Sequence, residues 1–405
     1  MTTLAQKSLL GLMLAGTTAL PALADDISWI YCGDSIDPVH EQYIAEWEAA
    51  NEGWTVTPEV VGWAQCQDKA TTLAVAGSPV AMAYVGSRTL KEFALNELIV
   101  PVPMTEEEQA EYYPNIVGTV TIDGEQWGVP IAFSTKAFYW NKDIFEEAGL
   151  DPETPPATWA ETIDFARQIT ENTDVAGYGL PAKTFDNTMH QFLHWVYTNN
   201  GEIIDGEGNI TMDSPEVLAA LQAYKDITPY SVEGATAYEQ NEIRAIFLDE
   251  SVGMIQTSVG AAFMLQDTDI NWGVADLPVG PSAKGPGTLL ITDSLAIFDG
   301  SGVEDKAIEF AKFITSPVVQ EAYEGGGAAS LTPLRPGPAV DAMVEAGPYW
   351  KPFIDGIEFG GPEPLFTDYK GFQNVMIEMV QSVVTGDAEP ADALTEAAAD
   401  LEDYK

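Results

Sequence analysis

Residues 128–150 read GVPIAFSTKAFYWNKDIFEEAGL, and this stretch changes character twice. It is apolar up to Phe133, polar at residues 134–136, and aromatic again before Asn141 opens an amphipathic helix. A strand that lies inside one buried parallel sheet is expected to be apolar along its whole length. The polar break therefore predicts a chain that leaves one hydrophobic core, crosses an open gap and enters a second core.

The length and composition of the chain agree with two cores. Its 405 residues exceed one typical domain, and 46% of them are hydrophobic, which is enough material for two packed interiors. Strands are expected at residues 27–31, 54–63 and 80–86, with helices between them at 38–50 and 65–76. This alternation predicts an α/β fold in which helices cover a parallel sheet. After residue 141 helices dominate, and one short hairpin is expected at residues 201–212.

The first 24 residues predict an export signal and not a part of the fold. Lys7 precedes an apolar run at residues 9–15, and Ala22, Leu23 and Ala24 form an A-x-A cleavage site. Because the residue directly after this site is Asp25 and not a cysteine, we expect a soluble periplasmic protein and not a lipoprotein. No later apolar run approaches the roughly 18 residues needed to span a bilayer.

The charge of the chain excludes one broad class of partner. There are 63 acidic and 17 basic residues, which give a formal net charge of −46. The acids are scattered, and no basic stripe exists that could neutralise phosphates. We therefore expect neither a nucleic-acid partner nor binding to anionic membrane surfaces. The scattered carboxylates suggest a solvated surface adapted to a salty exterior, where salt screens the self-repulsion.

Cys32 and Cys66 are the only cysteines of the chain. An even count in an exported protein favours a structural disulfide over a metal site or two free thiols. By chain entropy, closing a loop of this length stabilises the fold by roughly 3–4 kcal/mol.

The histidines do not form a recognisable metal motif. His190 and His194 stand four residues apart on an expected helix, but Gln191 occupies the place where a zinc protease needs Glu. His40 is the only other histidine. The helix could instead place His190 or Trp195 on the wall of a binding cleft, or bury both in ordinary packing. We expect no metal site.

Catalytic and cofactor motifs are not found either. The segment DGEGN at residues 205–209 lacks the spaced carboxylates of a calcium loop. The chain contains no nucleophile elbow, P-loop or dinucleotide fingerprint, so we expect neither a cofactor nor enzyme activity. A secreted glycoside hydrolase stays open as an alternative, because its two carboxylates need no local motif.

Five segments, taken in order, carry a resemblance to a known family. They are DGEQWGVPIAFSTKAFYWNKDIFEEAGLDPETPPATWAE (123–161), TNNGEIIDGEGNITMDSPEVLAALQAYKDI (198–227), NWGVADLPVGPSAKGPG (271–287), AIEFAKFITSPVVQEAY (307–323) and GDAEPADALTEAAADLE (386–402). No single segment is diagnostic, but their order and spacing together are specific. The chain resembles the family 1 extracellular solute-binding proteins, the sugar-binding subunits of ABC importers related to maltodextrin-binding protein.

The resemblance implies a type II periplasmic-binding-protein fold, in which two discontinuous α/β lobes are joined by a hinge. Lobe 1 is expected at residues 25–133 plus 280–333, and lobe 2 at residues 134–279 plus 334–405. The chain would cross the hinge at residues 133–136, 277–280 and 333–335. The implied function is a periplasmic receptor that binds a sugar or polyol between the lobes and delivers it to the membrane permease subunits. We expect a monomer.

Ligand-binding side chains are expected at the carboxyl ends of the strands, where α/β proteins place their sites. Sugars are held by planar hydrogen-bonding side chains and by aromatic faces. These rules single out Asp34 and Ser35 after the first strand, Trp63 after the second, and Ser87 and Arg88 after the third. The resemblance aligns Ser87 and Arg88 with a polar pair that contacts sugar, with Ser87 in the place of the usual acid. An ion pair with Asp or Glu is the alternative role for Arg88.

Four further candidates lie later in the chain. The resemblance implies a ligand contact at Ser134, in the first hinge crossing. Arg335 lies at the third crossing, where it is either a ligand contact or an ion-pair partner. Tyr238 and Thr257, from the second lobe, complete this group.

Two departures from the family pattern bear on the size of the ligand. The family often has Gly-Pro-Trp where this chain has Ser-Val-Gly at residues 258–260. Thr292 and Asp293 occupy the place of a second frequent aromatic residue. The site has therefore lost apolar platforms and has a carboxylate instead. This favours a monosaccharide, a polyol or a small glycosylated solute over a long oligosaccharide.

Four charged residues bear on the charge of the ligand. Arg88 and Arg335, if both face the cleft, could grip an anionic sugar derivative in bidentate fashion. Asp34 and Asp293 oppose this, because an anion beside two carboxylates is disfavoured unless each is paired. Asp–Arg pairs inside the cleft would present both donors and acceptors to hydroxyl groups. We therefore expect a neutral, hydroxyl-rich ligand, with an anionic derivative as the alternative.

Overall fold

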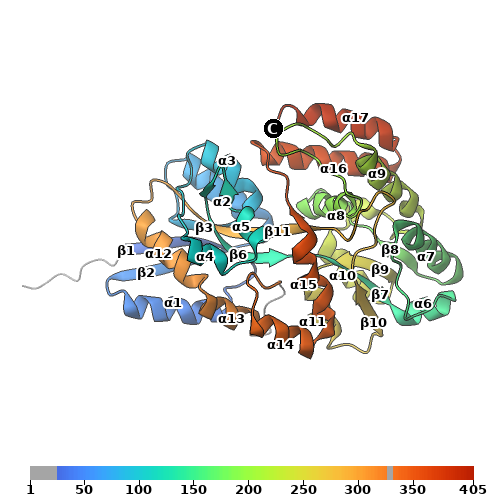
Figure 1. The fold of residues 1–405 in the computed structure, drawn as a ribbon, viewed down its shortest axis with the longest axis horizontal. Coiled ribbons are helices and arrows are strands. Elements are labelled where there is room, and N and C mark those ends of the chain that lie inside the picture. Colours follow the sequence, from blue (N-terminus) through green and yellow to red (C-terminus); the bar gives the residue numbers. More distant parts are fainter. Residues whose placement is uncertain (1–24, 326–331) are drawn as a thin grey trace, which may run out of the picture.

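The computed structural model describes residues 25–325 and 332–405, and these residues form two large β-sheets (Figure 1). The first sheet has six strands in the order β12-β11-β3-β1-β2, with β6 paired to β11. In it, β1 is parallel to β2 and β3, whereas β11 is antiparallel to β3 and β6. Its strands are β1 (Asp25–Cys32), β2 (Trp54–Val61), β3 (Met82–Gly86), β6 (Val129–Ser134), β11 (Thr288–Ile297) and β12 (Gly360–Pro362).

The second sheet has four strands in the order β10-β7-β9-β8. Here β7 is antiparallel to both β9 and β10, and β8 is parallel to β9. Its strands are β7 (Ala137–Asn141), β8 (Ala176–Gly179), β9 (Val252–Thr257) and β10 (Trp272–Ala275). A small third sheet pairs β4 (Thr121–Ile122) with β5 (Glu125–Gln126). The α/β class expected from the sequence is confirmed, but the expected parallel pairing holds only in part, because β6, β7, β10 and β11 make antiparallel pairs.

Helices that pack with the six-stranded sheet come from both ends of the chain. They are α1 (Pro38–Ala50), α2 (Trp63–Val75), α3 (Leu90–Leu95), α12 (Glu304–Ile314) and α13 (Pro317–Gly325). Two short helices, α4 (Glu106–Ala110) and α5 (Pro114–Gly118), precede β4. Segments far apart in sequence thus build one core, as Figure 1 shows by the blue and orange helices lying side by side.

The four-stranded sheet is covered on both faces. The helices on one face are α6 (Lys142–Ala148), α7 (Trp159–Asn172), α8 (Asp186–Tyr197), α9 (Pro215–Ile227), α16 (Tyr369–Thr385) and α17 (Pro390–Leu401). Those on the other are α10 (Gln240–Leu248), α11 (Gly260–Leu265), α14 (Pro338–Ala346) and α15 (Lys351–Phe359). Successive side chains of β7 alternate between these layers: Phe138 and Trp140 enter the first, whereas Ala137 and Tyr139 enter the second.

The polar break at residues 134–136 lies where the chain changes sheets. Strand β6 ends at Ser134 in the six-stranded sheet, and β7 begins at Ala137 in the four-stranded sheet. Thr135 and Lys136 therefore form the connection. The crossing predicted from the change of polarity is confirmed, because the two apolar segments on either side of it belong to different cores.

Several helices begin where their sequences provide a cap. Thr158 and Glu161 form a capping box at the start of α7, in which each side chain accepts a hydrogen bond from the backbone of the other residue. Ser214 caps α9, and Pro215 follows at the first helical position. Helix α6 is capped by Asn141 and ends at Gly149, whose φ of +83° suits glycine. These signals explain why the expected helix positions agree with the structure within a few residues.

The expected hairpin at residues 201–212 is present only in a minimal form. The structure has one isolated antiparallel bridge there, between Ile204 and Ile210, and no paired strands. The Asp205 carboxylate accepts hydrogen bonds from the backbone N–H groups of Glu207 and Asn209. These local bonds close a tight loop and compete with a strand ladder.

Two other sequence expectations concern covalent structure and membranes. Cys32 and Cys66 form a disulfide with a Cα–Cα distance of 5.6 Å, which confirms the expected pairing. It joins the end of β1 to α2. Among the described residues, no helix is long and apolar enough to cross a membrane. The expected export signal at residues 1–24 lies outside the described residues.

Candidate ligand-binding site

Arg88 is the centre of a charged cluster that joins the two halves of the molecule. It lies in a single turn, Ser87–Thr89, directly after β3 of the six-stranded sheet. Its guanidinium lies 3.2 Å from Glu363 Oε2, 3.4 Å from Asp186 Oδ2 and 3.5 Å from Asp293 Oδ1. The three carboxylates come from separate elements: the loop after β12, the first turn of α8, and the middle of β11. Because α8 packs on the four-stranded sheet, the cluster spans both sheets.

Gly86 makes room for the guanidinium. A Cβ at this position would lie 2.4 Å from Cζ of Arg88, closer than any real contact allows. Gly86 also pairs directly with Asp293 in the β3–β11 ladder. The absence of a side chain at Gly86 thus lets Arg88 fold back over the end of β3 toward the carboxylate of the neighbouring strand.

Two tyrosines and a histidine hold the carboxylates in place. Tyr84 donates a hydrogen bond to Asp293 Oδ2 at 2.9 Å, and Tyr369 donates one to Glu363 Oε1 at 3.2 Å. His190 Nε2 lies 2.5 Å from the same Glu363 oxygen. Asp293 and Glu363 therefore each accept from a tyrosine hydroxyl in addition to facing Arg88, which fixes the orientation of both carboxylates.

Burial and charge shift the pKa values of this cluster in different directions. Burial raises the pKa of Asp293 to about 6, although Arg88 and Tyr84 favour its charged form. Burial alone would also raise the pKa of Glu363, but Arg88 and His190 outweigh it and lower that pKa. For Arg88 itself, the nearby carboxylates overcome the effect of burial and raise its pKa well above the ordinary value. One cation faces three carboxylates, so the cluster has an excess of hydrogen-bond acceptors.

A cavity opens beside Arg88. It has an empty volume of about 310 Å³ and is lined by Ser87, Arg88, Gly118, Thr119, Leu290, Thr292, Pro362, Glu363 and Leu365. Thr292 Oγ1 is buried here and has no hydrogen-bond partner in the described part of the chain. The cavity combines this free hydroxyl with the Arg88–Glu363 pair, so it offers both donors and acceptors.

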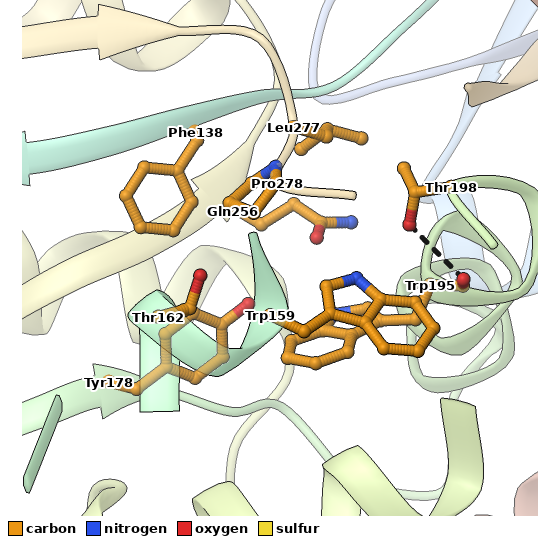
Figure 2. Close-up of a pocket in the computed structure, with 9 residues that line it drawn as sticks. All are labelled: Phe138, Trp159, Thr162, Tyr178, Trp195, Thr198, Gln256, Leu277 and Pro278. Atoms are coloured by element: carbon orange, nitrogen blue, oxygen red, sulfur yellow. Dashed lines mark hydrogen bonds between the residues drawn. The ribbon is translucent and has the colours of Figure 1, made fainter. Parts of the chain in front are cut away.

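A second cavity of about 220 Å³ lies inside the core of the four-stranded sheet (Figure 2). Its walls are mostly aromatic, with the indole rings of Trp159 and Trp195 overlapping at a centroid distance of 5.3 Å. Thr198 donates its hydroxyl to the carbonyl oxygen of Trp195, as the dashed line in Figure 2 marks. Trp195 is therefore a packing residue, whereas His190, on the same helix, belongs to the Arg88 cluster.

Four sequence-predicted residues lie in or beside the cluster. Arg88 and Asp293 form one of the expected Asp–Arg pairs. Ser87 is buried and exchanges a 2.6 Å hydrogen bond with Ser294 on β11. Trp63 is 53% exposed and packs edge-on against the Tyr84 ring at 5.2 Å, so its remaining surface faces solvent next to the Tyr84–Asp293 pair.

Arg335 is not joined to that cluster. Its Nη2 donates to the carbonyl oxygen of Thr315 at 2.7 Å, and its guanidinium lies 3.9 Å from the centre of the Tyr112 ring. Its nearest carboxylate is Glu111, at 3.8 Å. The expected pairing of two cleft arginines with two cleft aspartates is thus found for Arg88 and Asp293 only.

The remaining candidates are dispersed. Asp34 and Ser35 are exposed in the loop after β1, and Tyr238 is half-buried before α10. Ser134 donates its hydroxyl to the carbonyl oxygen of Thr135. Thr257, at the end of β9, is buried, and its hydroxyl has no partner among the described residues.

Sequence reasoning missed most of the partners of Arg88. Asp186 opens a helix, and Glu363 lies between two prolines after a pair of glycines, so neither belongs to a motif. Tyr84 lies in an apolar strand and Tyr369 at the start of a helix, so neither stands out as a partner of a charged group. The sequence did contain one signal for Tyr84. It lies two residues before Gly86 in β3, so its side chain is on the side of the strand where Arg88 folds back.

Comparison with known proteins agrees with this architecture. The sequence profile of the bacterial extracellular solute-binding proteins matches residues 35–321. A putative binding protein of Brucella abortus is 28% identical over 284 residues, which are 68% of each chain. The sn-glycerol-3-phosphate-binding periplasmic protein of Agrobacterium fabrum is 29% identical over 224 residues, 52% of this chain and 50% of that one.

A similar fold is seen in the crystal structure of an ABC transporter solute-binding protein from Thermotoga lettingae, solved with bound α-D-tagatose. The TM-score is 0.81 at 24% sequence identity, and the match covers 94% of this chain and 99% of that one. This chain belongs to the bacterial extracellular solute-binding protein family.

Proposed function

We propose that this protein is the binding receptor of an ABC importer, and that its solute is a small neutral saccharide or polyol. The observation that carries the proposal is the Arg88 cluster, in which groups from both sheets converge on one cation. A solute bound there contacts both lobes at once. The tagatose bound by the Thermotoga lettingae protein, which has the same fold, is a hydroxyl-rich solute of this kind.

The balance of charge in the cluster favours a neutral solute. Three carboxylates surround Arg88, so its donors are already shared among acceptors. An anion would compete with these carboxylates and would be repelled by them, whereas hydroxyl groups can donate to the carboxylates and accept from Arg88. Trp63 and Tyr84 provide aromatic surface for the C–H face of a sugar ring.

An anionic sugar derivative is the second candidate. The relative from Agrobacterium fabrum is named for binding sn-glycerol-3-phosphate, which is a phosphorylated polyol. For this chain to bind such a solute, Arg88 would have to exchange at least one carboxylate partner for the phosphate. The two candidates therefore differ in how strongly binding depends on ionic strength.

The proposed division into two lobes follows the arrangement of the sheets. We assign residues 25–133 plus 280–333 to lobe 1 and residues 134–279 plus 334–405 to lobe 2, joined by a hinge. Supporting this, β6 and β11 lie in the six-stranded sheet and β7 to β10 in the four-stranded one. Strand β12 is an exception, because it pairs with β11 although it falls in the second assignment. The protein acts as a periplasmic monomer, exported by a cleaved signal peptide, and presents its solute to the permease.

Isothermal titration calorimetry tests the proposed solute class. The probes are D-tagatose, D-mannitol, D-glucose, maltose and sn-glycerol-3-phosphate, each titrated at low and at high salt with product analysis afterwards. We expect saturable one-to-one binding of a neutral probe, an affinity that hardly changes with salt, and no turnover. Tight binding of the phosphorylated probe alone, weakening steeply with salt, would establish the anionic candidate. Conversion of a probe into products would show an enzyme and refute the receptor.

A further inference from the structure

Lys136 is a buried cation without a partner. It lies in the connection between β6 and β7, and its residue surface is 6% exposed. No hydrogen bond or ion pair joins its ammonium group to any described residue, whereas the guanidinium of Arg88 has three carboxylate partners. An ammonium group that is largely removed from water and has no partner is costly to the fold. Such a cost is tolerated where the group has a role in binding or catalysis.

The backbone direction places Lys136 on the side of helix α8. Thr135 donates its hydroxyl to the carbonyl oxygen of Phe353 in α15, so Thr135 faces the α15 side. Along β7, Ala137 and Tyr139 face that same side, while Phe138 faces the core that contains α8. Side chains alternate along an extended chain, so Lys136 shares the side of Phe138.

On that side Lys136 approaches the Arg88 cluster. Its ammonium interacts electrostatically with Asp186 and Asp293, which are both partners of Arg88. Burial lowers the pKa of Lys136 to about 8, with a further lowering from Arg244, while Asp186, Asp293 and Glu239 partly offset it. The ammonium thus borders the carboxylates of the site but is not neutralised by direct contact with any of them.

A second unused donor lies nearby on α8. His194 Nδ1 accepts a hydrogen bond from the backbone N–H of Leu289 at 3.1 Å, so the ring proton resides on Nε2. Nε2 is buried and has no partner among the described residues. Burial, followed by the charge of Lys136, lowers the pKa of His194 well below its ordinary value, so the ring is neutral. Two donors without acceptors therefore lie beside a cluster that has acceptors in excess.

We propose that Lys136 is a specificity-determining ligand residue, whose ammonium donates to a hydroxyl or ring oxygen of the saccharide or polyol. The proposal rests on the function proposed above and adds which residue contacts one end of the solute. Hydroxyl groups at one end donate to Asp293 and Glu363, and an oxygen at the other end accepts from Lys136. The bound solute gives the buried ammonium the hydrogen-bond acceptor that it lacks in the ligand-free protein. Lys136 therefore strengthens binding but lowers the stability of the ligand-free fold.

A ligand role and a structural role for Lys136 predict opposite effects of Lys136→Met. Methionine keeps the length of the side chain and removes the charge. If Lys136 serves the solute, the variant melts at a higher temperature than the wild type when no solute is present, because a buried unpaired charge is gone. If Lys136 supports the fold, the variant melts at a lower temperature.

The matched control is Lys183→Met. The Lys183 side chain is 45% exposed and pairs with Glu242 on the surface, and its ammonium forms no ion pair with a carboxylate of the Arg88 cluster. For the neutral probe that binds the wild type best, we expect Lys136→Met to weaken binding about tenfold to a hundredfold, as for the loss of a charged hydrogen bond. Lys183→Met should bind like the wild type. Lys136→Arg keeps the charge but has a different shape, so it should bind more tightly than Lys136→Met.

The dependence on pH provides an independent readout. The ammonium form is a much stronger donor than the neutral amine, so the wild-type dissociation constant should rise by up to about tenfold between pH 7 and pH 9 for a pKa of about 8. Asp293, with a pKa of about 6, and the neutral His194 do not titrate in this window, and Arg244 keeps its charge. In Lys136→Met this rise should disappear.

The outcomes separate the two proposals. If the wild type binds no saccharide or polyol of the panel, the proposed function fails, and the role of Lys136 fails with it. If the wild type binds a neutral probe, but Lys136→Met binds it equally well or shows the same rise with pH, only the role of Lys136 is overturned. A lower melting temperature of the ligand-free variant, with unchanged binding, assigns Lys136 to the fold.

Discussion

Gly86 determines where the charge of Arg88 can lie. A methyl group at this position would meet Cζ and Nη1 of Arg88 at 2.4 Å, and Arg88 is pinned there by three carboxylates. The backbone of Gly86 has φ −62° and ψ 130°, which any residue adopts, so alanine adds no backbone strain. A side chain at residue 86 would therefore affect the site only by steric contact with Arg88, and not by straining the backbone.

We predict that Gly86→Ala weakens binding of the preferred solute by about tenfold or more, because the guanidinium must leave its present position. Calorimetry measures the effect. Gly285→Ala is the control, since a Cβ at Gly285 meets nothing within 4 Å and its φ is not positive. Equal affinities of the two variants would show that the present position of Arg88 does not matter for binding.

Individual residues were predictable where a strand end or the family pattern marks them. Arg88 could be singled out because it follows directly after a strand, whereas Asp293, in the middle of β11, was singled out by the resemblance. Glu363 could not, because it is 275 positions from Arg88 and lies in an irregular loop. Lys136 was visible only as part of a polar break. Its burial depends on packing between two lobes, which no local pattern encodes.

At the scale of elements, capping explains where helices begin, and local hydrogen bonding explains why the expected hairpin stays minimal. Helix α9 (Pro215–Ile227) begins where Ser214 and Pro215 mark a helix start. In the hairpin, turn residues such as Asp205 and Asn209 satisfy one another, and only the Ile204–Ile210 bridge pairs the two arms. Turn chemistry predicts a bend reliably, but it does not show that strands flank the bend.

Close packing of α7 on β8 gives a test at this scale. A Cβ at Gly177 would lie 2.1 Å from the carbonyl oxygen of Ala166, which is a backbone atom in a helix and cannot move aside. We predict that Gly177→Ala destabilises the fold by roughly 3 kcal/mol, at the upper end of overpacking effects. Thermal unfolding measures it, with Gly206→Ala as control because nothing lies within 4 Å of that site. If both variants melt alike, the two elements can separate at little cost.

At the scale of the whole molecule, the sequence carried more information than at the scale of the site. Alternating strands and helices predicted the α/β class, and the polar break predicted two cores, because both depend on patterns that extend over many residues. The composition also limited the partners, since a net charge of −46 opposes nucleic acid without reference to any structure. The site depends on a few contacts between distant segments, so the same patterns could identify some of its members but not assemble them.

The last prediction concerns movement between the two lobes. The Arg88–Asp186 pair joins the turn after β3 to the start of α8, so a solute that binds in this region gains contacts from both sheets when they approach each other. Binding should therefore shift the population toward a closed form. We expect small-angle X-ray scattering to show a smaller radius of gyration when the protein is saturated with the solute that calorimetry identifies.

The measurement needs about 0.15 M salt, where the Debye length is about 8 Å, because the large negative charge otherwise makes the particles repel one another and distorts the low-angle data. A probe that calorimetry shows not to bind is the control, and it should leave the radius unchanged. Asp186→Asn removes one charge that reaches across the lobes, so this variant should need more solute for the same contraction. An unchanged radius of the saturated wild type would mean that the solute enters a rigid site. The lobes would then not move closer together when the solute binds.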